Sequence, residues 1–190
     1  MSTLRSTGSA QGHTHLKADG WKLTAMRKHH AYIGFGSNLG DRLTQCRKAL
    51  EALAALPGST LIKTSSFYET EPVGPIDQPP FINGVSLLQT ANDAHWLLVQ
   101  MLAIETRLGR VHTEKWGPRS IDLDLLFFDD RIINSPELSV PHPFLHQRRF
   151  VLAPLNEIAP DLRHPVLGQT VAELLKALEE GDQDVKLLVV

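Results

Sequence analysis

The stretch Ile121-Asp122-Leu123-Asp124-Leu125 alternates apolar and acidic residues over the length of a short strand. Successive side chains on a strand point to opposite faces, so we expect Ile121, Leu123 and Leu125 in the core and both aspartates on the other face. Two carboxylates only two positions apart on one face repel each other unless a cation lies between them. Carboxylate oxygens are hard ligands, which suit Mg²⁺. A solvent-facing sheet edge would produce the same alternation, so the pattern alone leaves both interpretations open.

Further elements are predicted on both sides of this strand. We expect strands over residues 31–35, 60–68, 84–90 and 121–128, and helices over about 42–56, 93–108, 140–158 and 171–178. Asp41 and Asp93 are suited to cap the first two helices, and residues 131–133 could pair back onto the acidic strand as a hairpin. The order β-α-β-β-α-β predicts an α+β, ferredoxin-like antiparallel sheet with helices packed on it, followed by C-terminal helices.

Composition narrows the class of protein. The 190 residues carry 19 basic and 21 acidic side chains, a formal net charge of −2, which argues against a nucleic-acid-binding surface. The longest apolar run, residues 52–56, is far shorter than the about 20 residues of a membrane span, so we expect no membrane association and a cytoplasmic location. Residues 1–30 lack apolar periodicity and are predicted to be a mobile N-terminal extension, with residues 31–190 forming one domain.

Arginines lie near the acidic strand in the sequence. Arg110 and Arg119 precede it and Arg148 follows it. A guanidinium group matches phosphate oxygens in bidentate geometry, so arginines beside paired aspartates indicate a nucleotide–Mg²⁺ site. Any one of these arginines could equally be a solvated surface residue.

A proline-rich loop, residues 69–83, ends in Phe81-Ile82-Asn83. Its prolines stiffen the backbone, and a ring beside an amide is suited to stack on a flat heterocycle and to read its edge, with Trp116 on the second face. Phe81 and Trp116 could instead be ordinary core aromatics. The glycines of residues 34–41 lack the spacing of a dinucleotide-binding loop and indicate a tight strand-to-helix turn.

Five stretches together resemble the 6-hydroxymethyl-7,8-dihydropterin pyrophosphokinase family of folate biosynthesis: AYIGFGSNLGDR (31–42), SSFYETEPVGPIDQPPFING (65–84), IETRLGR (104–110), WGPRSIDLDLL (116–126) and VPHPFLHQRRFVLAPLNEIAP (140–160). The resemblance implies an ATP-dependent diphosphokinase that transfers pyrophosphate from ATP to the pterin hydroxymethyl group and releases AMP. It also implies two Mg²⁺ ions, small-molecule substrates, and a monomer able to associate with other folate-pathway enzymes.

The resemblance implies roles for individual residues as well. Asp122 and Asp124 would hold the metals and, with Arg110 and Arg119, act in catalysis. The expected ATP-binding residues are Glu105, Arg110, Arg119, His142 and Arg148, and the expected pterin-binding residues are Thr70, Val73, Phe81, Asn83, Trp116 and Phe150.

The chain departs from the family pattern at Glu71, Phe81, His112, Lys115 and Pro143. His112 stands where many members have an arginine, and its loop, residues 111–115, is short. These two departures favour an alternative, a pterin- or nucleotide-binding paralogue with weak or no turnover. A third hypothesis, another Mg²⁺-dependent nucleotidyl-transfer enzyme on the same fold, does not account for the proline-rich loop.

Overall fold

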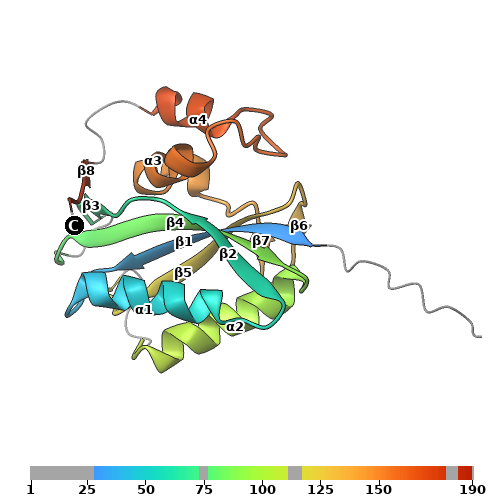
Figure 1. Ribbon diagram of the computed structural model, residues 1–190. Coiled ribbons are helices and arrows are strands. Elements are labelled where there is room, and N and C mark those ends of the chain that lie inside the picture. The colour runs from blue at the N-terminus through green and yellow to red at the C-terminus, as the bar shows by residue number, and fades with distance from the viewer. Residues whose placement is uncertain (1–27, 73–76, 111–116, 179–183, 190) are drawn as a thin grey trace, which may run out of the picture.

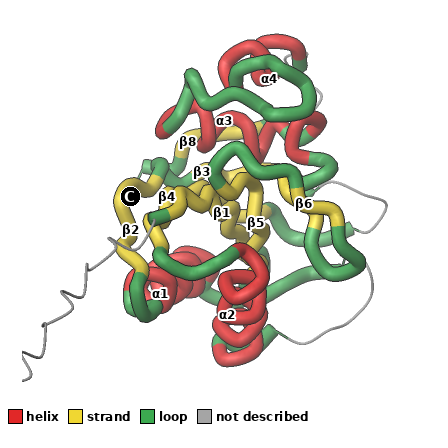
Figure 2. The backbone as a smooth tube through the Cα atoms, turned by 90° about the vertical axis from the view of Figure 1, so that its right-hand side faces the viewer, coloured by secondary structure: helices red, strands yellow, loops and turns green. Residues whose placement is uncertain are grey.

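The computed structural model describes residues 28–72, 77–110, 117–178 and 184–189. Its elements, in chain order, are β1 (His29–Ser37), α1 (Arg42–Ala54), β2 (Ser59–Thr64), β3 (Tyr68–Thr70), β4 (Phe81–Thr90), α2 (Ala94–Arg107), β5 (Asp122–Phe128), β6 (Ile133–Asn134), β7 (Ser139–Val140), the 3₁₀ helix η1 (Leu145–Gln147), α3 (Arg149–Ile158), α4 (Val171–Ala177) and β8 (Val185–Leu187). Helices α1 and α2 cover one face of the central sheet, and α3 and α4 cover the other (Figure 1, Figure 2).

The central sheet is antiparallel throughout. Within the described ranges it has six strands in the order β5-β1-β4-β3-β8, and β2 pairs with β4 on the same edge as β3. The long strand β4 therefore receives both β2 and β3, one after the other. The predicted α+β, ferredoxin-like order of strands and helices is confirmed.

Two sequence predictions about the strands were wrong. The single strand expected over 60–68 is divided into β2 and β3, because the hydroxyl of Ser65 accepts a hydrogen bond from the Val85 amide at 3.0 Å and interrupts regular pairing. The expected hairpin of residues 131–133 on β5 does not form, and β6 pairs with β7 instead. Asp129, at φ 51°, turns the chain away from β5.

The helix expected over about 140–158 begins only at Arg149, since strand β7 and the 3₁₀ helix η1 occupy part of its predicted first half. The first turns of α1 and α2 are capped as predicted. Asp41 accepts a hydrogen bond from the Thr44 amide at 3.1 Å, and Asp93 accepts one from the Trp96 amide at 2.8 Å. These carboxylates satisfy amide groups that have no partner inside the first helical turn. Gly109 follows the last turn of α2 at φ +82°, a conformation that glycine adopts without strain.

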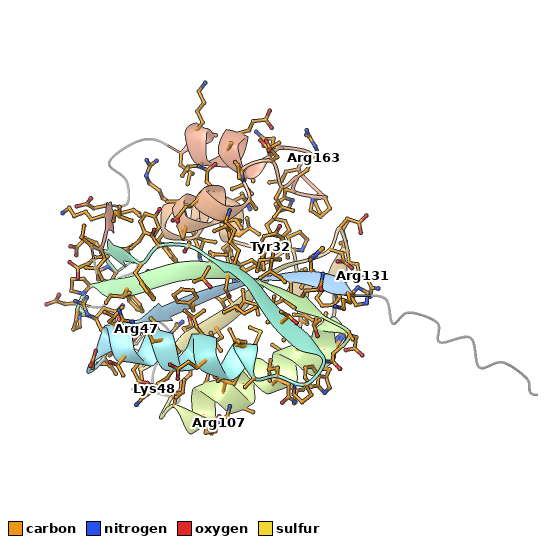
Figure 3. All side chains as sticks on the ribbon, in the orientation of Figure 1. Tyr32, Arg47, Lys48, Arg107, Arg131 and Arg163 are labelled. Carbon is orange, nitrogen blue, oxygen red and sulfur yellow. The ribbon has the colours of Figure 1, made fainter. Side chains whose placement is uncertain are left out.

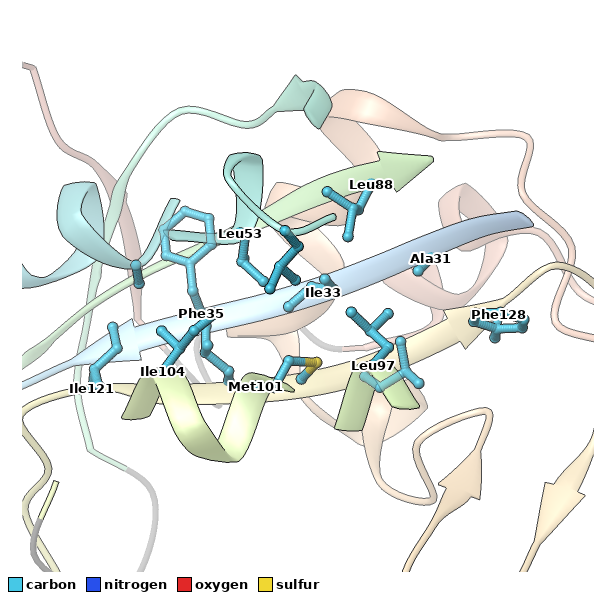
Figure 4. Close-up of a cluster of buried hydrophobic side chains, with 14 of the residues drawn as sticks. Ala31, Ile33, Phe35, Leu53, Leu88, Leu97, Met101, Ile104, Ile121 and Phe128 are labelled. Atoms are coloured by element: carbon cyan, nitrogen blue, oxygen red, sulfur yellow. The ribbon is translucent and has the colours of Figure 1, made fainter. Parts of the chain in front are cut away.

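Both faces of the sheet are buried, and each has its own hydrophobic core. On the α1/α2 face, Ile33 of β1 packs with Leu97, Met101 and Ile104 of α2, each at most 1% exposed (Figure 4). On the other face, residues of β4 and β5 pack against α3 and α4, namely Val85, Leu126, Phe127, Val151, Leu152, Leu155, Val171 and Leu174. The C-terminal helices thus form the second layer on the sheet. The sequence did not predict which face of the sheet they would cover.

The C-terminal residues add an edge strand that the sequence did not predict. Strand β8 pairs antiparallel with β3, which places Lys186 opposite Glu69 and Val185 opposite Thr70. The β3 strand is therefore held on both sides where it enters the proline-rich loop. None of the helices in the described ranges is both long and apolar enough to cross a membrane.

Candidate active site

A cavity of about 270 Å³ lies on the α3 side of the sheet. Charged groups of Asp122, Asp124 and Arg148 line it together with the rings of Phe81 and Phe150. A single space therefore offers acidic groups, cationic groups and aromatic faces at once.

The acidic strand reaches this cavity as its alternation predicts. Leu123 and Leu125 belong to the core on the α1/α2 face, where Ile121 is also buried. Asp122 and Asp124 point to the opposite face and line the cavity. The prediction that the two aspartates share one face is confirmed, and the face belongs to a cavity rather than to an open sheet edge.

Two glycines make room for side chains of the cavity wall. A Cβ atom on Gly36 would lie 2.3 Å from Oδ1 of Asn83, and one on Gly84 would lie 2.3 Å from Cζ of Phe35. Both distances are far inside van der Waals contact. The Asn83 amide can therefore lie over β1 only because position 36 has no side chain.

Asp122 is paired with two arginines. Arg110 donates from Nη1 to Oδ1 of Asp122 at 2.6 Å, and Arg119 donates from Nη1 to Oδ2. Charge-assisted hydrogen bonds of this kind are stronger than those between neutral groups. The pairing holds two guanidinium groups at the start of β5.

Glu105 of α2 holds Arg110 in this pairing from the α1/α2 side of the sheet. Its carboxylate is 2% exposed, accepts from the Leu123 amide at 2.6 Å and from Nη1 of Arg110, and has an Oε2 atom without a partner among the described residues. Burial raises the pKa of Glu105 to about 7, against the opposing effect of the Leu123 amide and Arg110. Glu105 thus joins α2 to β5 and to Arg110, and it does not line the cavity.

Asp124 is held much more loosely than Asp122. Nε2 of His142 and Nη1 of Arg148 lie 3.9 Å and 3.8 Å from its Oδ2 atom, beyond hydrogen-bond distance. Within the described residues neither oxygen of Asp124 accepts a hydrogen bond. Burial, and then repulsion from Asp122, raise the pKa of Asp124 above its ordinary value, so its charge is only partly compensated by the protein.

His142 faces Asp124 as a neutral ring. Burial, and then the positive charge of Arg148, lower its pKa to about 4. Its Nδ1 atom accepts a hydrogen bond from the Phe144 amide at 3.2 Å, which assigns the ring proton to Nε2. A neutral donor therefore points towards Oδ2 of Asp124.

The opposite wall has the features of a site for a flat polar ring. Nδ2 of Asn83 donates to the Thr70 hydroxyl at 2.7 Å, and both residues are less than 10% exposed. Within the described residues Oδ1 of Asn83 accepts no hydrogen bond, so the amide can still read a donor on a bound ring. Phe81 and Phe150 supply aromatic faces to the same cavity.

The sequence pattern of the 7,8-dihydro-6-hydroxymethylpterin-pyrophosphokinase (HPPK) family matches residues 32–160. This chain belongs to that family. The 2-amino-4-hydroxy-6-hydroxymethyldihydropteridine pyrophosphokinase of Pseudomonas aeruginosa is 44% identical over 146 residues, which cover 77% of this chain and 90% of the relative. The enzyme of the same name from Methylorubrum extorquens is 44% identical over 149 residues, covering 78% and 93%. The family predicted from the five sequence stretches is confirmed.

Solved structures support the fold independently. A Plasmodium falciparum HPPK-DHPS structure with pterin and p-hydroxybenzoate superimposes with a TM-score of 0.62 at 20% identity, over 79% of this chain and 42% of that one. An HPPK-DHPS structure in complex with substrates gives a TM-score of 0.61 at 14% identity, over 80% of this chain and 43% of that one. The present chain spans less than half the length of either.

The structure assembles most of the predicted site residues of this HPPK family member. Thr70, Phe81, Asn83, Arg119, Asp122, Asp124, Arg148 and Phe150 line the cavity. Arg110 bonds to the lining residue Asp122 and His142 lies 3.9 Å from Asp124, whereas Glu105 bonds to Arg110 and Leu123, neither of which lines the cavity. Val73 and Trp116, and the departures at His112 and Lys115, lie outside the described residues.

Asn38 was missed by the sequence reasoning, which assigned its segment only a turn. It is 2% exposed, and its Oδ1 accepts from the Arg119 amide at 2.7 Å. Its Nδ2 donates to Oε1 of Gln78 at 3.0 Å and to the Pro79 carbonyl at 3.2 Å. One buried amide therefore ties the proline-rich loop to the backbone of Arg119, across the cavity. The available signal was a polar residue between Gly36 and Gly40, in the connection from β1 to α1.

Two sets of basic residues lie on opposite sides of the sheet. Arg47 and Lys48 on α1 and Arg107 on α2 are exposed and lie on the outer side of the helix layer, away from the sheet (Figure 3). Arg119 and Arg148 line the cavity on the other side of the sheet. The nearly balanced net charge thus conceals a cavity in which carboxylates and guanidinium groups lie together, an arrangement suited to an anionic ligand that carries metal ions.

The donor set fits Mg²⁺ that is bound mainly by its substrate. Across the described ranges no group of three or more His, Cys, Asp and Glu side chains is arranged around a common ion site. Mg²⁺ at phosphate sites commonly takes one or two carboxylates and completes its shell with water and phosphate oxygens. Asp122 and Asp124 match that requirement, and Asp124 has oxygens free of protein hydrogen bonds among the described residues.

Proposed function

We propose that this HPPK family member transfers the β,γ-pyrophosphoryl group of ATP to the hydroxymethyl oxygen of 6-hydroxymethyl-7,8-dihydropterin, yielding the pterin diphosphate and AMP in folate biosynthesis. The observation that carries the proposal is a cavity in which Asp122, Asp124 and Arg148 face the same space as the Thr70–Asn83 pair. A polyphosphate and a flat polar heterocycle can therefore meet there.

The reaction forms one bond and breaks one bond. The hydroxymethyl oxygen attacks the β-phosphorus of ATP, the bond from that phosphorus to the bridging oxygen of the α-phosphate breaks, and AMP leaves with that oxygen. The hydroxyl proton is released to solvent. Phosphoryl transfer of this kind requires alignment of the two oxygens and compensation of phosphate charge more than covalent chemistry by the protein.

The charged wall is suited to both tasks. Asp122 and Asp124 would hold two Mg²⁺ ions, which supply charge neutralisation and a template for the phosphates when bound. Arg119 and Arg148 present guanidinium groups to the same phosphates, and Arg110 keeps Asp122 in place. Catalytic roles for these residues are part of the proposal.

The uncharged wall would orient the pterin. Oδ1 of Asn83 can accept a hydrogen bond from an N–H group on the edge of the ring, and the hydrogen bond to Thr70 prevents the amide from rotating. Phe81 and Phe150 can stack on the ring faces. Val73 and Trp116 are proposed to complete this pocket.

The test is AMP formation from ATP, measured with and without 6-hydroxymethyl-7,8-dihydropterin at saturating Mg²⁺. We expect AMP to appear only when both substrates are present, in amounts equal to the pterin diphosphate. No pterin-dependent AMP would contradict the proposal. Calorimetric binding of both substrates without AMP would instead indicate the paralogue without turnover, whose rationale rests on the loop 111–115, outside the described residues.

The organisation of the chain belongs to the same proposal. Residues 31–190 would form the pyrophosphokinase domain and residues 1–30 an extension, although β1 begins two residues earlier, at His29. We propose a cytoplasmic location and a monomer that can associate with other folate-pathway enzymes. The HPPK-DHPS chains among the solved structures support such an association.

A further inference from the structure

Arg148 differs from the other arginines near the cavity in what holds it. Arg110 and Arg119 both donate hydrogen bonds to Asp122. Nη1 of Arg148 lies 3.8 Å from Oδ2 of Asp124, and within the described residues its guanidinium group donates no hydrogen bond. The N–H groups of Arg148 therefore remain available for a ligand.

Two phenyl rings flank Arg148, in addition to the more distant carboxylate of Asp124. Its Cζ atom lies 5.5 Å from the ring centroid of Phe144 and 5.7 Å from that of Phe150. A guanidinium group within about 6 Å of a ring face is attracted to it by the ring quadrupole. The rings restrict where the group lies while leaving its hydrogen-bond donors free.

The two rings are not equivalent. Phe150 packs against the core under α3 and α4, so it has a structural role in any case. Phe144 is 51% exposed and belongs to neither hydrophobic core. It is held from its backbone, whose amide donates to Nδ1 of His142 at 3.2 Å, and its ring lies 6.1 Å from the His142 ring. Core packing therefore does not account for a large apolar ring on the cavity wall.

We propose that Phe144 is a positioning residue that keeps the Arg148 guanidinium directed at the β- and γ-phosphates of the nucleotide, beside Asp124. This inference rests on the proposed function and adds a residue to it. Without the ring, Arg148 would retain Phe150 on one side and sample more rotamers on the other. Affinity for the polyphosphate would fall, whereas affinity for a nucleotide without these phosphates would not change.

The experiment compares Phe144→Leu with Phe144→Tyr, because leucine keeps apolar bulk and tyrosine keeps the ring. Binding of a non-hydrolysable ATP analogue and of AMP is measured by calorimetry in Mg²⁺. We expect Phe144→Leu to weaken analogue binding by about five- to tenfold and to leave AMP binding unchanged, and Phe144→Tyr to match the unmodified protein. Val166→Ala, at an exposed position outside the cavity lining, is the matched control.

A double-mutant cycle with Arg148→Ala identifies the route of the effect. If Phe144 acts through Arg148, Phe144→Leu has no further effect in the Arg148→Ala background. Equal loss in both backgrounds, or equal loss of ATP-analogue and AMP binding, would overturn the inference and point to a stacking contact with the base. The binding measurements need no turnover, so absence of pterin-dependent AMP from the unmodified protein would count against the proposed function alone.

Discussion

The two ends of β5 carry aspartates in contrasting surroundings. At the far end from the cavity, Asp129 accepts from the His30 amide at 2.8 Å, and its Oδ2 lies 2.6 Å from Nδ1 of His29. Each oxygen of that carboxylate has a partner. At the cavity end, the basic side chains nearest to Asp124 among the described residues are His142 and Arg148, and both are beyond hydrogen-bond distance.

This difference separates a carboxylate that stabilises the fold from one available to a ligand. Hydrogen bonds from His30 and His29, and the charge of Arg131, outweigh the effect of burial and lower the pKa of Asp129. At Asp124, burial and the neighbouring Asp122 raise the pKa instead. The pKa values of Asp129 and Asp124 are thus shifted in opposite directions, because the protein hydrogen-bonds both oxygens of Asp129 and, within the described residues, neither oxygen of Asp124.

The strongest test of the comparison is Asp124→Ala. We expect pyrophosphoryl transfer to fall by more than about a hundredfold, because the metal and phosphate charges lose a ligand, while the midpoint of thermal unfolding is unchanged or raised. Steady-state kinetics and calorimetry measure the two effects. Asp129→Ala is the matched control for turnover, and an Asp124→Ala protein that lost its fold would remove the distinction between the two ends.

The reciprocal change is Asp129→Ala. It removes the hydrogen bonds of His29 and His30 and leaves alanine at φ 51°, so the free energy of unfolding should fall by about 2 kcal/mol. Urea unfolding measures the loss, and turnover per folded molecule should be unchanged. Asp130→Ala, at the exposed neighbouring position, should leave stability intact. A loss of turnover without a loss of stability would contradict the assignment of Asp129 to the fold and of Asp124 to the ligand.

Asn38→Ala tests how far the cavity end depends on neutral hydrogen bonds. It removes the connection between Arg119 and the proline-rich loop, so KM for the pterin should rise by about tenfold. Asn38→Asp keeps the acceptor for the Arg119 amide but loses the donor to Pro79, and it should have an intermediate effect. Asn134→Ala, on exposed β6, is the control. Unchanged kinetics in Asn38→Ala would show that the two loops are held in other ways.

The smallest expected effect is in the pH dependence of stability. A carboxylate whose folded pKa is lowered contributes stability above its ordinary pKa, and loses that contribution as the pH falls through the folded value. Acidification from about pH 5 to about pH 2 should therefore destabilise the unmodified protein more than Asp129→Asn. Urea midpoints across this range measure the difference. Parallel curves would mean that Asp129 has no net electrostatic role beside His29 and Arg131.

Local sequence patterns predicted the elements whose causes are local. Alternation over two residues places Asp122 and Asp124 on one face of β5, and the capping of α1 and α2 depends on Asp41 and Asp93, each bonded three residues ahead. Family resemblance added the identity of the cavity residues. That Glu105 faces ATP stays a prediction; its carboxylate accepts hydrogen bonds from Leu123 and Arg110 and does not line the cavity.

By itself the sequence determined the fold class, the acidic face of β5 and the family, since each is written in neighbouring residues or in short contiguous stretches. Only the tertiary structure decided that β8 supports β3, that Asn38 joins two loops, and that Phe144 lies against Arg148. The first two contacts link positions from 40 to more than 100 residues apart. The contact between Phe144 and Arg148 depends on how η1 and α3 orient these two side chains, so that both line the same cavity. Hydrogen bonds and ring contacts of this kind leave no periodic pattern, because they depend on where the folded chain brings the groups together.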